Sequence, residues 1–209
     1  MRIAVLGGTG SFGRALAARL AAAGDAVVIG SRDAERAATA ATELGPGVTG
    51  ATNPDAVRDV DLAVLAVRAD AALPTARDVS DALGATPLFS VATAISFERG
   101  VGALPDPDAR SLAERVQDVV AAPVAAGLHS IAAANLDAAP PDEDALVCGD
   151  DERAKALALA LAAKVVAGRA LDAGPLASAR ALEGLTAVIV NLNRRYKAHA
   201  GIRVTGVDR

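Results

Sequence analysis

A glycine-rich turn near the N-terminus has the spacing of a dinucleotide-binding loop. The apolar run 3–6 leads into a Gly-x-Gly-x-x-Gly motif, and an amphipathic segment, 14–23, follows at once. N–H groups at the start of such a helix face the space above the turn, where they can bind a diphosphate. Gly8 would permit the tight turn, Gly10 the approach of the backbone to the diphosphate, and Gly13 close packing of helix on strand. The intervening residues of this candidate cofactor site are Thr9, Ser11 and Phe12.

The end of the next apolar run predicts which dinucleotide is bound. An NAD site usually has an acidic residue there, which binds the ribose 2′-hydroxyl. Here the run ends at Ser31 and Arg32, and Arg36 lies one helical turn further along. Because a guanidinium group forms paired hydrogen bonds to phosphate, this pattern favours NADP over NAD. Asp33 and Glu35 also lie nearby, but they fall in a predicted first helical turn, where the helix dipole favours acids.

Composition excludes several other classes of protein. The chain has 209 residues, of which 52% are hydrophobic, enough for the core of one large domain or one domain with a small appendage. A net charge of −4 and few aromatic residues argue against a nucleic-acid surface. No apolar run could span a bilayer, and Met1 leads straight into a strand, so we expect a cytoplasmic protein without a signal peptide. The single cysteine, Cys148, excludes an internal disulfide and is expected to pack in the core.

Strands and helices alternate along the chain. This order predicts a Rossmann-type, doubly wound parallel sheet with helices on both faces and a small C-terminal helical portion. The expected strands cover 3–6, 27–30, 48–50, 62–67, 87–91, 120–126, 145–148 and 165–172. Helices are expected over 14–23, 33–44, 74–83, 111–119, 151–163 and 175–197, with a brief one capped by Asn53, and 96–107 reads as a loop. We divide the chain into an NADP-binding domain, 1–126, and a smaller portion, 127–209, that completes the cleft.

His129 is the candidate for chemistry in the second half of the chain. It follows a predicted strand whose end points toward the cofactor crevice. The imidazole could donate a hydrogen bond or a proton to an acceptor, or it could satisfy local carbonyl groups. Position alone does not separate these roles.

The remaining charged clusters read more simply as helix ends. Residues 150–152 precede an apolar-periodic helix, so their carboxylates are expected to cap it. His199 lies near Arg194, Arg195 and Lys197 at the end of the last helix, where positive charge complements the helix dipole. In the alternative interpretation, these cations bind an acidic tail of the substrate. No catalytic triad or metal-ligand spacing is present. Hydride transfer, which needs little from the protein beyond alignment of two rings, fits this sequence.

Two blocks, 171–176 and 182–186, are far more distinctive than the glycine motif. Together with 3–10, 29–32, 128–131 and 147–151, they resemble the NADPH-dependent coenzyme F420 reductases, also called F420H2:NADP oxidoreductases. The resemblance extends over nearly the whole chain. It implies a Rossmann fold, a homodimer, and hydride transfer between NADP(H) and coenzyme F420, an 8-hydroxy-5-deazaflavin.

The resemblance also implies roles for individual residues. Thr9, Ser31, Arg32 and Arg36 would hold the 2′-phosphate end of NADP. Three loops would face the nicotinamide and deazaflavin rings, through Val67, Arg68, Val91, Ala92, His129 and Ser130.

Two departures from the family pattern leave alternatives open. Related sequences commonly have a proline where this chain has Arg68, and a proline-containing loop where it has 90–95. Arg68 is therefore a candidate anion contact. One alternative is an NADPH-dependent reductase of a flavin, a ferric chelate or an imine; the other is a non-catalytic NADPH-binding sensor module. An open cleft beside Val91 and His129 would favour F420 as the substrate. A cleft narrowed by Arg68 would favour another acceptor, and a cleft filled by the protein's own side chains would favour a sensor module.

Overall fold

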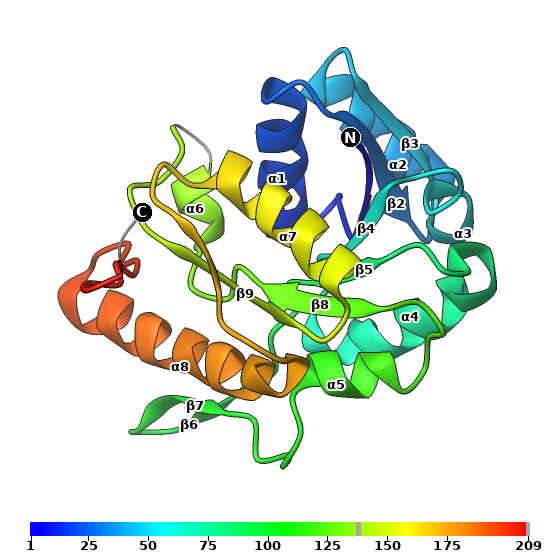
Figure 1. Ribbon diagram of the computed structural model, residues 1–209. Coiled ribbons are helices and arrows are strands. Elements are labelled where there is room, and N and C mark those ends of the chain that lie inside the picture. Colours follow the sequence, from blue (N-terminus) through cyan, green and yellow to red (C-terminus); the bar gives the residue numbers. More distant parts are fainter. Residues whose placement is uncertain (137–138, 208–209) are drawn as a thin grey trace.

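An eight-stranded sheet with helices on both faces forms the centre of the molecule (Figure 1). The computed structural model describes residues 1–136 and 139–207. In chain order the strands are β1 (Arg2–Leu6), β2 (Ala26–Ser31), β3 (Val48–Thr52), β4 (Leu62–Leu65), β5 (Leu88–Ser90), β6 (Ile95–Glu98), β7 (Gly102–Pro105), β8 (Val124–Gly127), β9 (Ala145–Gly149) and β10 (Ala170–Asp172). The helices are α1 (Ser11–Ala22), α2 (Ala34–Leu44), α3 (Asn53–Ala56), α4 (Ala69–Leu83), α5 (Leu112–Gln117), α6 (Ala133–Leu136), α7 (Glu152–Val165), the 3-10 turn η1 (Leu176–Ser178) and α8 (Ala179–Tyr196).

The strand order confirms the predicted doubly wound architecture. The sheet runs β10-β9-β8-β5-β4-β1-β2-β3, and every pair from β8 to β3 is parallel. The chain builds outward from β1 to β3, then returns and builds from β4 in the other direction. The crevice outside β1 and β4 is therefore the switch point at which such sheets bind ligands.

The last two strands reverse direction. β9 is antiparallel to β8, and β10 is parallel to β9. Because β9 starts at the sheet edge where β8 ends, β8 and β9 place His129, directly after β8, at the carboxyl edge of the parallel strands. The reversal thus keeps the His129 loop beside the crevice.

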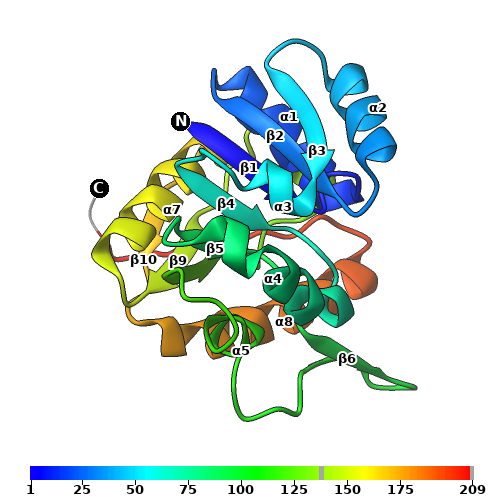
Figure 2. The same ribbon diagram turned by 90° about the vertical axis from the view of Figure 1, so that its right-hand side faces the viewer.

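Alternating side chains of the strands build a separate core on each face of the sheet. In β1, Ile3 and Val5 pack with buried residues of α1, α2 and α7. Ala4 and Leu6 point the other way and pack with α3, α4, α5 and the start of α8. Figure 2 shows the sheet between these layers. Continuous apolar runs such as 62–65 are what a parallel strand buried on both faces requires.

Several local expectations need correction. Helix α4 starts at Ala69 rather than at Pro74, and two strands start later than expected, β8 at Val124 and β10 at Ala170. The segment expected to be a loop contains an antiparallel hairpin, β6–β7, which projects from the sheet in Figure 2. The hairpin packs on α8, where the Asn191 side chain accepts from the N–H of Ala103 and donates to its carbonyl, both at 2.8 Å. In α3 the cap is Thr52 rather than Asn53, because Thr52 has extended backbone and its hydroxyl accepts from the N–H of Asp55. No helix in the described part of the chain is long and apolar enough to cross a membrane.

Candidate active site

The glycine turn brings β1 and α1 close together. The tight turn depends on Gly7, with its positive φ of +83°, and not on Gly8 as expected; Gly8 instead lies against the side chain of Ile29. The N–H of Gly10 donates to the carbonyl of Gly7 at 2.9 Å. A Cβ at Gly13 would lie 2.4 Å from the same carbonyl oxygen, so only glycine allows this approach of helix to turn.

The N-terminus of α1 offers free donors above this turn. Gly10 occupies the cap position, no side chain caps the helix, and no acidic residue lies in the first turn. The first N–H groups of a helix have no partner within it, and they lie at the positive end of its dipole. The local structure therefore suits an anion such as a diphosphate.

A cavity of about 740 Å³ extends from this helix end to the end of β2. Most of the residues predicted to bind the cofactor line it, namely Thr9, Gly10, Ser11, Phe12, Ser31, Arg32, Arg36, Val67 and Arg68. Arg32 and Arg36 are both exposed, and neither forms an ion pair with another described residue. They can therefore turn toward a phosphate without breaking an existing contact.

The acid nearest this end of the cavity is already engaged. Asp33 caps α2, and its carboxylate accepts from the N–H groups of Glu35 and Arg36 at 3.0 and 3.2 Å. A carboxylate held in this way is poorly placed to bind a ribose 2′-hydroxyl. The geometry agrees with the preference for NADP read from the sequence.

A second, smaller cavity of about 240 Å³ lies at the ends of β5 and β8. It shares Phe12, Ala66 and Val67 with the first, so the two cavities adjoin each other, and together they are called the cleft. Its other lining residues are Val91, Ala92, Thr93, Leu128, His129, Ile131 and Thr186. The surface is mostly apolar, as expected where two flat rings must meet without water.

His129 is buried at the wall of the smaller cavity. The side chain is 7% exposed, and neither ring nitrogen forms a hydrogen bond of ordinary geometry with a described residue. Burial lowers the pKa of His129 to about 4, and the backbone of Ala92 offsets part of this shift. The imidazole is therefore neutral at physiological pH, with one donor and one acceptor nitrogen.

Two residues of α8 support this wall, and sequence reasoning gave neither of them a role. The Thr186 hydroxyl donates to the backbone carbonyl of His129 at 2.7 Å. One turn earlier, the buried carboxylate of Glu183 accepts from the N–H groups of Leu112 and Ala113 at 3.0 and 3.1 Å, and burial raises its pKa. Glu183 thus fixes α8 to α5, and Thr186 fixes the loop that contains His129, called the acceptor loop below, to α8. A glutamate on the apolar face of the last helix is the signal that could have indicated this.

Other predicted site residues lie outside the cleft or at its rim. Arg68 donates to both carboxylate oxygens of Asp70, at 3.2 and 2.9 Å, and is 86% exposed, so it does not narrow the cleft. Ser130 is buried and lines neither cavity. Gly8 and Gly13 lie beneath the turn and act through packing. Cys148 is buried, and burial raises the pKa of its thiol to about 12, as expected for a core residue.

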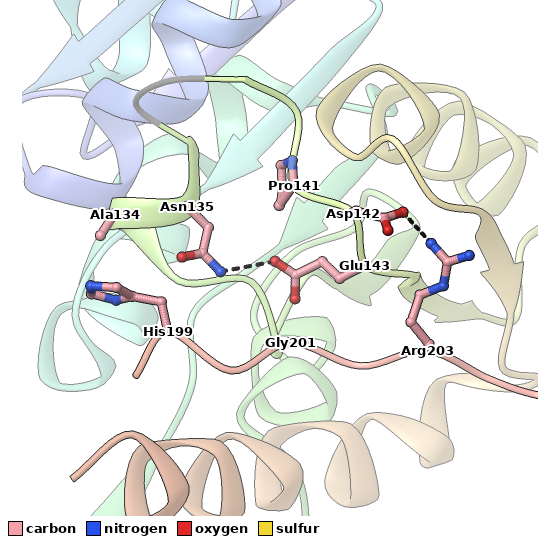
Figure 3. A pocket seen from close by; sticks show the side chains of 8 residues that line it. All are labelled: Ala134, Asn135, Pro141, Asp142, Glu143, His199, Gly201 and Arg203. Carbon is pink, nitrogen blue, oxygen red and sulfur yellow. Dashed lines mark hydrogen bonds and ion pairs between the residues drawn. The ribbon is translucent and has the colours of Figure 1, made fainter. Parts of the chain in front are cut away.

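A separate cavity of about 420 Å³ lies between the loop after α6 and the C-terminal segment (Figure 3). Asn135 donates to one oxygen of Glu143 at 3.1 Å, and Arg203 pairs with Asp142. His199 lines this cavity, whereas Arg194 and Arg195 line a different groove, so the predicted cluster at the end of the last helix is divided between two places. Nowhere in 1–136 and 139–207 do three His, Cys, Asp or Glu side chains meet in a way that could hold a metal ion.

Comparisons with known proteins agree with this geometry. A family model described as "NADP oxidoreductase coenzyme F420-dependent" matches residues 2–94. The chain is 39% identical to the F420-dependent NADP reductase of Methanothermobacter marburgensis, over 99% of each chain. It is 34% identical to the protein of the same name from Methanocaldococcus jannaschii, over the full length of both.

Solved structures show the same likeness. A crystal structure from Arthrobacter sp. FB24, provisionally described as an F420 dependent NADP-reductase, superposes with a TM-score of 0.86 at 27% identity, covering 98% of this chain and 99% of that one. A pyrroline carboxylate reductase of Plasmodium falciparum, at 12% identity and a TM-score of 0.62, shares the fold alone; 94% of this chain and 64% of that one are covered. The assignment to a family rests on sequence identity over the full length of the chain, because a shared fold alone does not define a family. The chain belongs to the family of F420-dependent NADP reductases.

Proposed function

We propose that this protein transfers a hydride between NADP(H) and coenzyme F420. The single observation that carries the proposal is the pair of adjoining cavities: a dinucleotide cavity with two arginines that form no ion pair with another described residue, and an apolar cavity beside His129. Among the residues that line the apolar part, His129 is the only one with a titratable side chain, and it is neutral. Such a surface suits a reaction whose chemistry is supplied by the two bound rings.

Each part of the cleft has a proposed task. The free N–H groups of α1 would bind the diphosphate of NADP, and Ser31, Arg32 and Arg36 its 2′-phosphate. Val67, Val91 and the His129 loop would hold the two rings face to face. In this arrangement bound NADPH would supply a hydride to bound F420, and solvent would supply the accompanying proton. The protein contributes alignment and exclusion of water.

The same proposal assigns a binding task to each of the two parts of the chain. Residues 1–126 would bind NADP, and 127–209 would complete the acceptor half of the cleft through β8, the His129 loop and α8. The cytoplasmic location expected from the sequence stays a prediction.

The protein is further proposed to form a homodimer. Val188, Leu192 and Tyr196 recur every four residues along α8 and are exposed, and Phe97 of the neighbouring hairpin is 65% exposed. Exposed apolar side chains gathered in this way are typical of an interface between subunits. Light scattering after gel filtration would give a dimer mass for the parent protein and a monomer mass for Leu192→Glu. A monomeric parent would contradict the proposal.

A spectroscopic assay tests the proposed reaction. Purified protein is mixed with NADPH and oxidised F420, and the deazaflavin absorbance is followed, with FMN as a parallel acceptor. Loss of the absorbance with F420, and no comparable oxidation of NADPH with FMN, is the expected result. Equal or faster NADPH oxidation with FMN would favour a reductase of another acceptor. NADPH binding without turnover of either acceptor would favour a sensor module.

A further inference from the structure

Asn53 is buried beside the dinucleotide cavity, and its Oδ1 atom has no hydrogen-bond partner in the described ranges. Only 3% of the residue is exposed. The adjacent polar groups bond each other instead, since the hydroxyl of Thr52 donates to the carboxylate of Asp55 at 2.6 Å. Because a buried polar group without a partner costs free energy, a role in ligand binding would explain why an asparagine stands here.

The fold places Asn53 next to the residues expected to bind the 2′-phosphate. β2 and β3 are parallel, and Ser31 is opposite Thr52, so Asn53 directly follows the strand position that faces Ser31. The amide lies over the end of β2, because a Cβ at Gly30 would be 2.9 Å from Oδ1. The side chain therefore reaches from the start of α3 to the carboxyl end of β2.

Two cavities adjoin each other at this place. The dinucleotide cavity and a neighbouring cavity of about 430 Å³ share four lining residues, namely Ser31, Arg32, Asn53 and Thr75. The neighbouring cavity is also lined by Asp78 of α4, an exposed carboxylate that does not line the dinucleotide cavity. Because a carboxylate repels a phosphate, the 2′-phosphate is favoured on the side away from Asp78. Asn53 borders that side together with Ser31 and Arg32.

We propose that the side-chain amide of Asn53 donates a hydrogen bond to the 2′-phosphate of NADP and so contributes to the preference for NADP over NAD. The inference rests on the proposed function, because that proposal places the phosphate at Ser31 and Arg32. With Oδ1 against Gly30, the Nδ2 group is the end of the amide that faces the phosphate. An amide N–H group complements a phosphate oxygen, and its lack of charge lets it be buried without a counter-ion.

Titration with NADPH and NADH, followed by fluorescence, tests this inference without an acceptor. Asn53→Ala is expected to raise the Kd for NADPH about 10- to 100-fold, as the loss of a hydrogen bond to a charged group allows. The Kd for NADH is expected to stay within about threefold of the parent value, because NADH has no 2′-phosphate. Calorimetric titration with adenosine 2′,5′-bisphosphate and with AMP should show the same contrast and would assign the effect to the adenosine end.

The isosteric variant Asn53→Asp provides a readout that a loss of packing does not produce. Its carboxylate would repel the 2′-phosphate and would accept a hydrogen bond from the free 2′-hydroxyl of NADH, as acidic residues do in NAD sites. We expect this variant to bind NADPH at least as weakly as Asn53→Ala does, and to bind NADH more tightly than Asn53→Ala does. Because it keeps the size of the side chain, it also carries the test if the alanine variant fails to fold.

A matched control separates this contact from the general loss of an amide. Asn135→Ala removes a side-chain amide from the separate cavity of Figure 3 and should leave both Kd values unchanged. Thermal midpoints are measured for every variant to confirm an intact fold. An unchanged Kd for NADPH in Asn53→Ala, or an equal rise for NADPH and NADH, would overturn the inference while the proposed reaction stands. A parent protein that binds NADPH but reduces no F420 would overturn the proposed reaction alone, and one that binds neither dinucleotide would overturn both.

Discussion

Replacement of Arg32 by alanine should convert this protein from one that prefers NADPH to one that distinguishes NADPH and NADH poorly. Arg32 lines the dinucleotide cavity, is exposed, and has no ion-pair partner among the described residues, so its removal leaves no buried group unsatisfied. The loss is then limited to the contacts that we propose it makes with the 2′-phosphate. Hydrogen bonds to charged groups contribute about 1.5–3 kcal/mol, which corresponds to roughly a 10- to 150-fold weaker Kd for NADPH.

Fluorescence titration with NADPH and NADH measures this effect without the need for an acceptor. The Kd for NADH should change less than about threefold, because NADH lacks the phosphate that Arg32 is proposed to contact. Arg36→Ala should produce a smaller change of the same kind, and Arg153→Ala, on α7, should produce none. Equal losses for both dinucleotides in Arg32→Ala would refute the assignment of the 2′-phosphate to this end of the cavity.

Three further predictions concern the acceptor loop and the C-terminal cavity. His129→Ala should lower kcat roughly tenfold without abolishing turnover, since hydride transfer needs no obligatory base. Complete inactivity of a folded mutant would argue against this supporting role. Because the pKa of His129 is about 4, the kcat/KM profile of the parent should show no ionisation of this residue between about pH 6 and 8. Thr186→Val removes the hydrogen bond to the His129 carbonyl and should raise the KM for F420 several-fold at an unchanged KM for NADPH; a change in both would indicate a general loss of structure. Burial raises the pKa of Glu143, with the Asn135 hydrogen bond offsetting part of the shift, so the folded state loses stability relative to Glu143→Gln as pH rises through that raised pKa. Urea unfolding measures the free energy of unfolding of both proteins at pH 5 and at pH 8. The free energy of the glutamine variant, relative to that of the parent, should be higher at pH 8 than at pH 5. The same difference at both pH values would contradict the prediction.

Much of the fold could be predicted because its signals are local. The glycine turn, the apolar run 62–65 and the cap Asp151 each depend on residues that are neighbours in the sequence. Alternation of such elements restricts the topology to a doubly wound sheet. The dinucleotide half of the cleft follows from the same local pattern, because one turn and the end of one strand supply most of its polar groups.

The acceptor half was less predictable because long-range contacts build it. The bond from Thr186 to the His129 carbonyl joins residues 57 positions apart, and Glu183 meets the start of α5 from 71 positions away. The hairpin, which lies where the sequence predicts a loop, is hydrogen-bonded to α8 through Asn191, 88 positions from Ala103. Apart from Glu183, a carboxylate on the apolar face of α8, these partners leave no signal in the sequence.

The antiparallel direction of β9 places the loop that contains His129 beside the dinucleotide half of the cleft. In a fully parallel sheet, the segment after β8 would cross back to the opposite edge, and residues 128–144 would leave the crevice. Because β9 runs antiparallel, the segment stays at the carboxyl edge, where Leu128 adopts a positive φ of 62° and turns His129 toward the rings' expected position. A bulky residue with that backbone conformation is strained, and strain of this kind persists only where the surrounding structure holds it. The hydrogen bond from Thr186 is such a restraint, which is why α8, far from the dinucleotide, belongs to the active site.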